Sequence, residues 1–317
     1  MVNSATGERS EIILERVKQH VPAWSEVDLS EVAIRRLSGL SNACYRVELK
    51  QGVHVDEKEC DRIYLYRKFE CQIVDKQIEK AISKCMSEKG LGPRLIYSND
   101  SYRIESFFDG RPLTIWEMRN PVMMSQFATA IHNFHTKSGV AEAVQLTRPL
   151  NTNKLYLDER ISEWGPACVE RIAKIRSKLT RLEERGQGQE KILRIIDDIE
   201  HTMLKPGFEE VHRALVPRDK AVMSHNDGQA YNILSSLTDA TDIMLIDYEY
   251  GMWNPQYYDL AIYLNELVAD NAYPGGNGIA YYLSNWAEER EIEFLTQKYF
   301  ELQNPDVRWS MQSEECQ

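Results

Sequence analysis

Three side chains able to bind a metal or accept a proton follow short apolar runs within residues 221–251. The run at 221–223 predicts a buried strand, and the polar residues after it end on Asp227. Asn232 comes five residues later, directly before the apolar pair 233–234. A polar turn and the apolar run 243–246 complete a hairpin pattern that ends on Asp247. We therefore expect the three side chains to leave the ends of neighbouring strands and to meet.

The order and spacing of Asp227, Asn232 and Asp247 are typical of a phosphotransferase. In a kinase catalytic loop an Asp orients the substrate hydroxyl, and an Asn five residues later holds Mg²⁺. A second Asp, after an apolar strand, completes the metal site. Mg²⁺ prefers such oxygen ligands and fills its shell with phosphate oxygens and water. Each residue alone is better explained as a turn former, so the prediction depends on the ordered set.

The segment HNDGQAYNIL, followed by LIDYEYG, resembles the choline/ethanolamine kinase family, a branch of the kinase-like fold shared with aminoglycoside phosphotransferases. This resemblance implies an α+β, two-lobed protein-kinase-like fold with a small β-rich N-terminal lobe and a larger, mainly helical C-terminal lobe. The residues 109–112 break the strand pattern, which places the boundary near residue 108. We expect a nucleotide-binding lobe at 1–108 and a catalytic and substrate lobe at 109–317.

Composition limits the class of partner. The 317 residues are 43% hydrophobic and 27% charged, as in a globular protein with a sizeable core. A net charge of −11 argues against nucleic-acid binding and suits a small cationic substrate. No apolar run approaches about 18 residues and no secretory signal opens the chain, so we expect no membrane span and a cytoplasmic location. The six scattered cysteines are expected to be reduced thiols.

The family resemblance assigns nucleotide contacts in the N-terminal part. It implies that Ser41 and Asn42 help form the loop over the phosphates, although the pattern alone fits an ordinary hairpin turn equally well. It places a phosphate-contacting guanidinium at Arg67 and pairs it with Glu79 on the following helix. Without the resemblance, both side chains would be read as surface charges.

The resemblance also implies contacts further along the chain. Glu105 and Phe107 lie in the segment expected to offer backbone groups to adenine, and Gln229 is expected near the nucleotide. The predicted amino-alcohol site contains Asp227 and two further carboxylates, with two aromatic side chains that could attract an ammonium group. These four residues are Glu249, Glu266, Tyr273 and Trp286.

Helical patterns fill much of the remaining sequence. Apolar residues at steps of three and four between Met124 and Phe134 predict a buried stripe. His132 and His135 lie beside it and are expected to make local hydrogen bonds. Residues 155–216 predict two charged amphipathic helices separated by a turn at 186–188. Asp259 matches a family residue that braces the catalytic loop, but its sequence context favours a helix N-cap.

Taken together, the resemblance implies ATP- and Mg²⁺-dependent phosphorylation of choline and/or ethanolamine, giving phosphocholine or phosphoethanolamine for phospholipid headgroup synthesis. Family members usually continue into a W-x-x-W pair that surrounds the ammonium group, whereas this segment has Trp309 alone. The expected substrate wall is therefore missing, replaced by the shorter segment, or supplied by another chain. The alternatives are another small-molecule kinase of the same fold, acting on an aminoglycoside or thiosugar, and a kinase-like binding protein without activity. The family also allows a homodimer.

Overall fold

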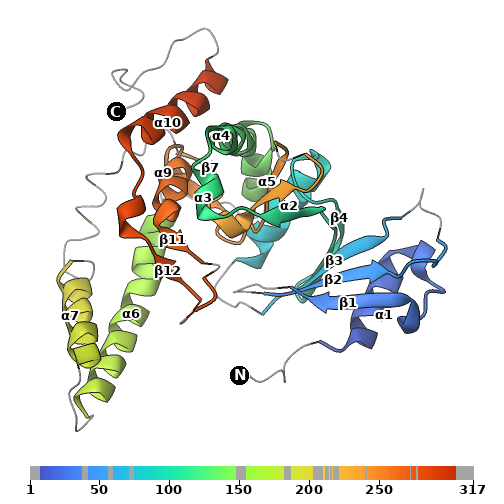
Figure 1. Ribbon diagram of the computed structural model, residues 1–317, viewed down its shortest axis with the longest axis horizontal. Helices are drawn as coiled ribbons and strands as arrows, with labels where there is room; N and C mark the ends of the chain where they lie inside the picture. The colour runs from blue at the N-terminus through green and yellow to red at the C-terminus, as the bar shows by residue number, and fades with distance from the viewer. Residues whose placement is uncertain are drawn as a thin grey trace. The chain divides into compact units, whose positions relative to one another are not determined.

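Figure 1 shows a computed structural model of the protein. It describes residues 8–37, 42–55, 60–70, 75–147, 155–181, 187–202, 210, 214, 216, 221–239, 241–271, 273–275 and 278–304. The chain divides into two compact units, of which the first contains residues 1–149, 225–251 and 259–317 and the second residues 150–224 and 252–258. Each unit is described on its own.

An antiparallel five-stranded sheet, in the order β1-β2-β3-β5-β4, forms the N-terminal part of the first unit. Its strands are β1 (Val32–Arg36), β2 (Ala43–Leu49), β3 (Ile63–Lys68), β4 (Leu95–Ser98) and β5 (Tyr102–Ser106). Helix α1 (Ser10–His20) packs on this sheet, because its Ile13, Leu14 and Val17 share one buried cluster with Val47 and Tyr64 (Figure 1). The β-rich character expected of the N-terminal part is confirmed.

Helix α2 (Lys76–Glu88) connects β3 to β4 and begins at an acidic cap. The Asp75 carboxylate accepts hydrogen bonds from the backbone N–H groups of Gln77 and Ile78, which would otherwise lack partners at a helix start. The buried face of α2 carries apolar residues together with Glu79 and Ser83. Two polar side chains on a buried face require hydrogen-bond partners. Arg103 on β5 is the partner of both.

The remaining helices of the first unit contain the predicted buried stripe. They are α3 (Ile115–Met118), α4 (Pro121–Thr136), α5 (Val140–Thr147), α9 (Tyr258–Asn265, whose first residue lies in the second unit) and α10 (Glu289–Gln303). Helix α4 buries Met124, Phe127 and Phe134 as the spacing predicts. His135 on the same helix is hydrogen-bonded as predicted, but not locally, because its partner is the Tyr299 hydroxyl of α10 at 2.7 Å, 164 positions along the chain.

Three short strands form the sheet that contains the hairpin after Asn232. They are β6 (Gly110–Pro112), β8 (Ile233–Ser236) and β9 (Ile243–Leu245), paired in the order β6-β8-β9. The hairpin predicted after Asn232 is confirmed. The residues that were expected only to break a pattern instead form β6. The lobe boundary expected near residue 108 falls inside the first unit and stays a prediction.

A second small hairpin of the first unit follows α9. Its strands are β11 (Ala269–Asp270) and β12 (Ala280–Tyr281). Four of the cysteines fall within the described ranges, and all four are free thiols. Over the same ranges, no helix combines the length and the apolar character needed to cross a bilayer.

The second unit contains helices α6 (Tyr156–Thr180) and α7 (Gln187–Thr202) and strands β7 (Ala221–Ser224) and β10 (Met252–Pro255). Arg176 joins the two helices through Asp197 at 2.8 Å and Glu200 at 2.6 Å. The two charged helices are confirmed, but the turn expected at 186–188 is misplaced, because α7 already includes Gln187. Strand β7 pairs with β10 and not with the hairpin strands, which corrects the expected neighbour.

Candidate active site

The three residues of the central motif meet in one cavity. Asp227, Asn232 and Asp247 all line a space of about 560 Å³ in the first unit. Pairing of β8 with β9 explains this, since the backbone N–H of Ile246 donates to the Asn232 carbonyl at 3.0 Å. Asp247 follows with a left-handed φ of 68°, a conformation that Asp tolerates better than most residues. The hairpin therefore delivers the amide and the carboxylate to the same place.

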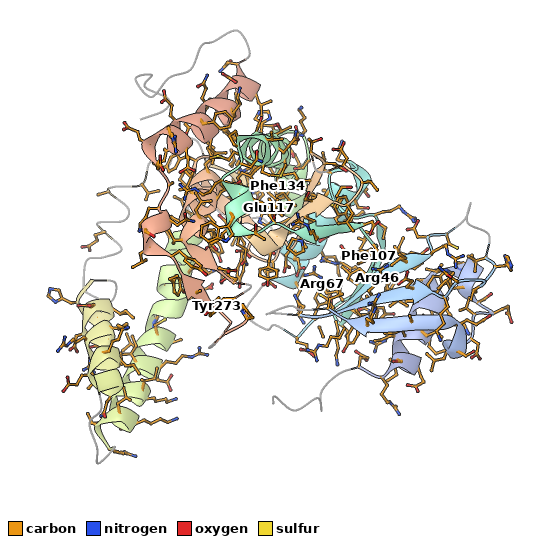
Figure 2. The ribbon with its side chains drawn as sticks, viewed as in Figure 1. Arg46, Arg67, Phe107, Glu117, Phe134 and Tyr273 are labelled. Atoms are coloured by element: carbon orange, nitrogen blue, oxygen red, sulfur yellow. The ribbon has the colours of Figure 1, made fainter. Side chains whose placement is uncertain are left out.

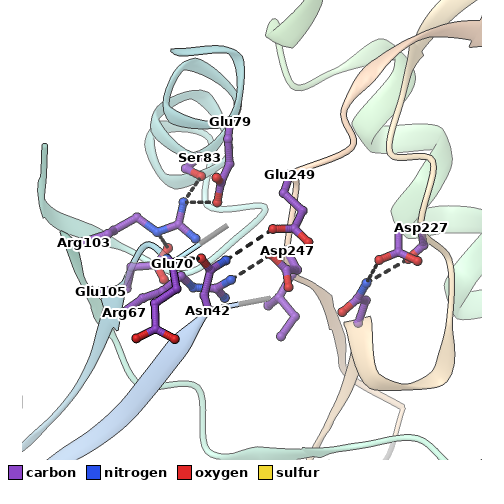
Figure 3. A network of polar contacts seen from close by, with 12 residues as sticks. Asn42, Arg67, Glu70, Glu79, Ser83, Arg103, Glu105, Asp227, Asp247 and Glu249 are labelled. Atoms are coloured by element: carbon purple, nitrogen blue, oxygen red, sulfur yellow. Dashed lines mark hydrogen bonds and ion pairs between the residues drawn. The ribbon is translucent and has the colours of Figure 1, made fainter. Parts of the chain in front are cut away.

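Asp227 is held by two amides. Its Oδ2 accepts a hydrogen bond from Asn232 Nδ2 at 2.6 Å (Figure 3). It accepts another from Gln229 Nε2 at 3.2 Å. Burial raises the pKa of Asp227 above its ordinary value, against the lowering effect of His225 and these hydrogen bonds. A raised pKa makes the carboxylate a better proton acceptor. This arrangement suits a group that accepts or orients a hydroxyl proton.

Asp259 fixes the backbone that carries Asp227. Its fully buried carboxylate accepts the N–H groups of His225 at 2.9 Å and Asn226 at 2.7 Å, and His135 Nε2 lies 2.8 Å away. Burial would raise the pKa of Asp259, but the hydrogen bonds and charge of its partners hold that pKa below the ordinary value. The prediction of a simple helix N-cap is therefore wrong, because the carboxylate braces the loop.

Arg67 on β3 reaches the carboxylate of Asp247. Its guanidinium lies 2.7 Å from Asp247 Oδ1, and only 5% of its side chain is exposed (Figures 2 and 3). Burial disfavours the charged form, but the charge of Asp247 keeps the pKa of Arg67 well above its ordinary value. The cavity thus contains a permanent cation beside two carboxylates.

Glu79 pairs with Arg103 and not with Arg67, which corrects the expected ion pair. Arg103 on β5 donates to Glu79 at 3.1 Å and to the Ser83 hydroxyl at 2.6 Å, and its Nε lies 3.1 Å from Glu105 (Figure 3). These partners satisfy the two polar residues on the buried face of α2. Burial raises the pKa of Glu79, although Arg103 opposes that rise. Helix α2 is therefore tied to the sheet through Arg103.

Other predicted residues also line the cavity. They are Asn42, Glu105, Phe107, Gln229 and Glu249. Asn42 Nδ2 donates to Glu249 at 3.3 Å, and its Oδ1 accepts the backbone N–H of Glu70 at 3.2 Å. The ring of Phe107 lies 4.7 Å from the guanidinium carbon of Arg46, a cation–π contact visible in Figure 2.

Several predicted residues lie elsewhere. Glu79 and Glu266 are not among the lining residues, but each contacts one: Glu79 contacts Arg103, and the Glu266 carboxylate lies 3.5 Å from Asn271 Nδ2. Tyr273 (labelled in Figure 2) and Trp286 are 41% and 53% exposed and are not among the lining residues. Ser41 and Trp309 fall outside the described residues.

Among the cavity residues that were missed from the sequence are Arg103 and Asn271. For Arg103 a signal existed, because Arg103 and Glu105 share one face of an alternating strand and Glu79 and Ser83 are one helical turn apart. For Asn271 the sequence offered none, since an Asn after a short strand is ordinary turn chemistry.

Comparison with known proteins decides the family. A family model described as choline/ethanolamine kinase matches residues 34–315. The chain belongs to the choline/ethanolamine kinase family. Among curated members, it is 28% identical to a probable choline kinase 2 from Arabidopsis thaliana over 62% of this chain and 48% of that protein. It is 24% identical to a probable ethanolamine kinase from the same plant, over 80% of this chain and 61% of that protein.

Solved structures of the family confirm the expected fold. The crystal structure of a choline kinase from Cryptosporidium parvum Iowa II superposes with a TM-score of 0.67 at 20% identity, covering 97% of this chain and 83% of that one. The expected α+β, protein-kinase-like fold is thereby confirmed. The chain spans about half to three fifths of the length of the curated relatives named above.

Proposed function

We propose that this family member transfers the γ-phosphoryl group of ATP to the hydroxyl of a small amino alcohol, choline or ethanolamine. The observation that carries the proposal is the convergence of Asp227, Asn232, Asp247 and Arg67 on one cavity. The curated relatives named choline and ethanolamine kinases support the acceptor class. The products would be phosphocholine or phosphoethanolamine, which are phospholipid headgroup precursors. A cytoplasmic location and a homodimer stay predictions.

Asp227 has the acceptor role in this proposal. Its Oδ2 is committed to two amide donors, which leaves Oδ1 to accept a hydrogen bond from the substrate hydroxyl. Because the transition state of phosphoryl transfer is loose, orientation of that hydroxyl contributes more than complete removal of its proton. The brace from Asp259 then holds the carboxylate in one place.

The donor set around Asp247 fits Mg²⁺. Among the described residues no three His, Cys, Asp or Glu side chains form a closed metal site. Asp247 and Asn232 offer hard oxygen ligands from only two side chains, and Mg²⁺ normally takes the remainder of its shell from phosphates and water. When bound there, the ion would neutralise negative charge on the phosphates. Asn232 and Asp247 would hold it.

The nucleotide side of the cavity is formed by the sheet. Arg67 would place a permanent positive charge near the phosphates, because a guanidinium stays charged and can hold two oxygens at once. Phe107 and the adjacent β5 residues would contact the base. Arg103 keeps Glu79 and Glu105 occupied, so that neither carboxylate competes for Arg67.

The test is phosphoryl transfer by the purified chain and by Asp227→Asn. With Mg-ATP and either amino alcohol, we expect the wild type to consume ATP and form the phosphate ester, and the variant to turn over about 10²- to 10⁴-fold more slowly. Mg-ATP should still raise the melting temperature of the variant, because Asp227 accepts the hydroxyl and does not hold the nucleotide. Near-normal turnover by Asp227→Asn would refute its role.

The same assay separates the alternatives. Turnover of an aminoglycoside or a thiosugar, with none of choline or ethanolamine, would indicate another small-molecule kinase of this fold. Stabilisation by Mg-ATP without turnover of any alcohol would indicate a kinase-like binding protein. Both outcomes contradict the proposed acceptor, and they differ in whether product forms.

A further inference from the structure

A continuous chain of hydrogen bonds leads from the catalytic carboxylate to a second carboxylate. Gln229 Nε2 donates to Asp227 at 3.2 Å, and Asn271 Nδ2 donates to Gln229 Oε1 at 2.8 Å. The same Nδ2 lies 3.5 Å from Glu266 Oε2. Asp227, Gln229 and Asn271 all line the cavity, whereas Glu266 is not among the lining residues.

The direction of these bonds determines what Asn271 offers to a ligand. Its amide nitrogen is engaged by Gln229 and Glu266, so the amide oxygen is the group left for another partner. In the ranges that the structure describes, no donor reaches that oxygen. An amide oxygen in a cavity accepts hydrogen bonds and donates none.

The electrostatic surroundings favour a cation beside this oxygen. Burial raises the pKa of Glu266 to about 7, and the nearby charge of Asp227 adds to the rise. Two carboxylates that disfavour each other's ionisation are stabilised when a positive charge comes between or beside them. Asn271 lies between the two along the hydrogen-bond chain, on the cavity wall.

We propose that Asn271 is a specificity-determining residue that selects an acceptor with N–H bonds, a primary ammonium alcohol, over a quaternary ammonium alcohol. This inference rests on the proposed function and deepens it. A primary ammonium donates a hydrogen bond to the Asn271 oxygen while its hydroxyl lies at Asp227. A quaternary ammonium carries the same charge but has no N–H, so it would desolvate the amide oxygen without replacing its hydrogen bond.

The size of the preference for ethanolamine over choline follows from the hydrogen bond that choline cannot make to the Asn271 amide oxygen. A site built to hydrogen-bond a ligand rejects an analogue that leaves its polar group unpaired. We expect kcat/KM for ethanolamine to exceed that for choline by about 10- to 100-fold in the wild type. Steric exclusion alone would instead reduce kcat/KM progressively with each added methyl group.

The experiment uses a graded series on the full chain. Ethanolamine, N-methylethanolamine, N,N-dimethylethanolamine and choline carry three, two, one and no N–H bonds at the same charge below their amine pKa values. We expect the largest fall in kcat/KM at the last step, from dimethylethanolamine to choline. In Asn271→Leu, which has a similar size but no polar atom, the step should shrink to less than about threefold.

A matched control and an internal ratio keep this test interpretable. Asn265→Leu makes the same substitution at an exposed asparagine outside the cavity. Its kcat/KM values for the four amino alcohols should keep the wild-type ratios. Because the ratio of two substrates is measured on the same preparation, partial misfolding of Asn271→Leu does not alter it. A wild type that prefers choline, or an Asn271→Leu variant in which kcat/KM falls equally for all four substrates, would overturn the role of Asn271 and leave the proposed function standing. Absence of turnover with all four would instead overturn the proposed function.

Discussion

Replacing Arg103 by methionine would remove the guanidinium that holds Glu79, Ser83 and Glu105 in the interior of the first unit. Side-chain exposure is 2% for Arg103, 2% for Glu79 and 3% for Glu105, so solvent cannot take over the lost contacts. Breaking one partner from a buried ion pair costs about 3–5 kcal/mol, because a charge is left uncompensated. Here two carboxylates lose their partner, while Arg67 remains near both. We expect the free energy of unfolding to fall by about 3–5 kcal/mol at pH 7.

The loss of stability in the Arg103 variant should also depend on pH, which provides a second test. Burial already raises the pKa of Glu79, and loss of Arg103 would raise it further. In the variant, Glu79 therefore binds a proton more tightly in the folded state than in the unfolded state. The resulting loss in the free energy of unfolding is complete above the folded-state pKa of Glu79 and decreases as pH falls through that value. Urea unfolding at pH 7.5 and pH 5 should show the penalty shrink on acidification.

Arg111→Met supplies the matched control. Arg111 likewise makes two contacts to carboxylate oxygens, both on Glu117 at 2.5 and 2.9 Å, but 51% of its side chain is exposed. Exposed pairs contribute about 0–1 kcal/mol. The hydrogen bond from Arg111 lowers the pKa of Glu117 to about 2, so this small contribution is lost as pH falls from about 4.5 through 2. Equal losses of stability in the two variants at pH 7.5 would refute the reasoning.

Two further predictions concern the catalytic loop and the acceptor site. Asp259→Asn, which presents an amide where His225 and Asn226 donate, should lower kcat at least about tenfold and destabilise the fold by about 1–3 kcal/mol; unchanged kcat in steady-state assays would exclude the brace. Because the pKa of Asp259 is depressed, its stabilising contribution should be present above about pH 3.8 and lost on further acidification. The KM for ethanolamine should fall as pH rises from 6 to 8, because Glu266 ionises with a pKa of about 7. Glu266→Gln should remove that dependence, and a KM profile identical to wild type would contradict it.

The local elements were predictable because their signals are local. Strand alternation in β2 and the spacing of Phe127 and Phe134 on α4 each depend on neighbours within a few residues. The meeting of Asn232 with Asp247 was predictable too, because a hairpin fixes both ends of its strands. The pairing of β7 with β10 was not, since those strands are about 30 residues apart and share no turn.

Long-range partners of buried charges were the part that sequence could not decide. Asp259 was expected to cap its own helix, because that interaction needs only adjacent residues. The structure gives its carboxylate to backbone N–H groups more than 30 positions earlier in the chain. Nothing in a single sequence distinguishes a helix cap from a brace on a distant loop, since in both cases N–H groups donate to one acidic side chain.

The exchange of partners between Arg67 and Arg103 has a geometric cause. In the β3–β5 pairing these two residues are directly opposite each other. Like charges at opposed positions repel, so each arginine needs carboxylates of its own. Helix α2 presents Glu79 and Ser83 to Arg103, and β5 adds Glu105. Arg67 is thereby left to Asp247 at the catalytic hairpin. A sequence argument could place both arginines on one face of the sheet, but the choice between them depends on the strand register and on where α2 packs.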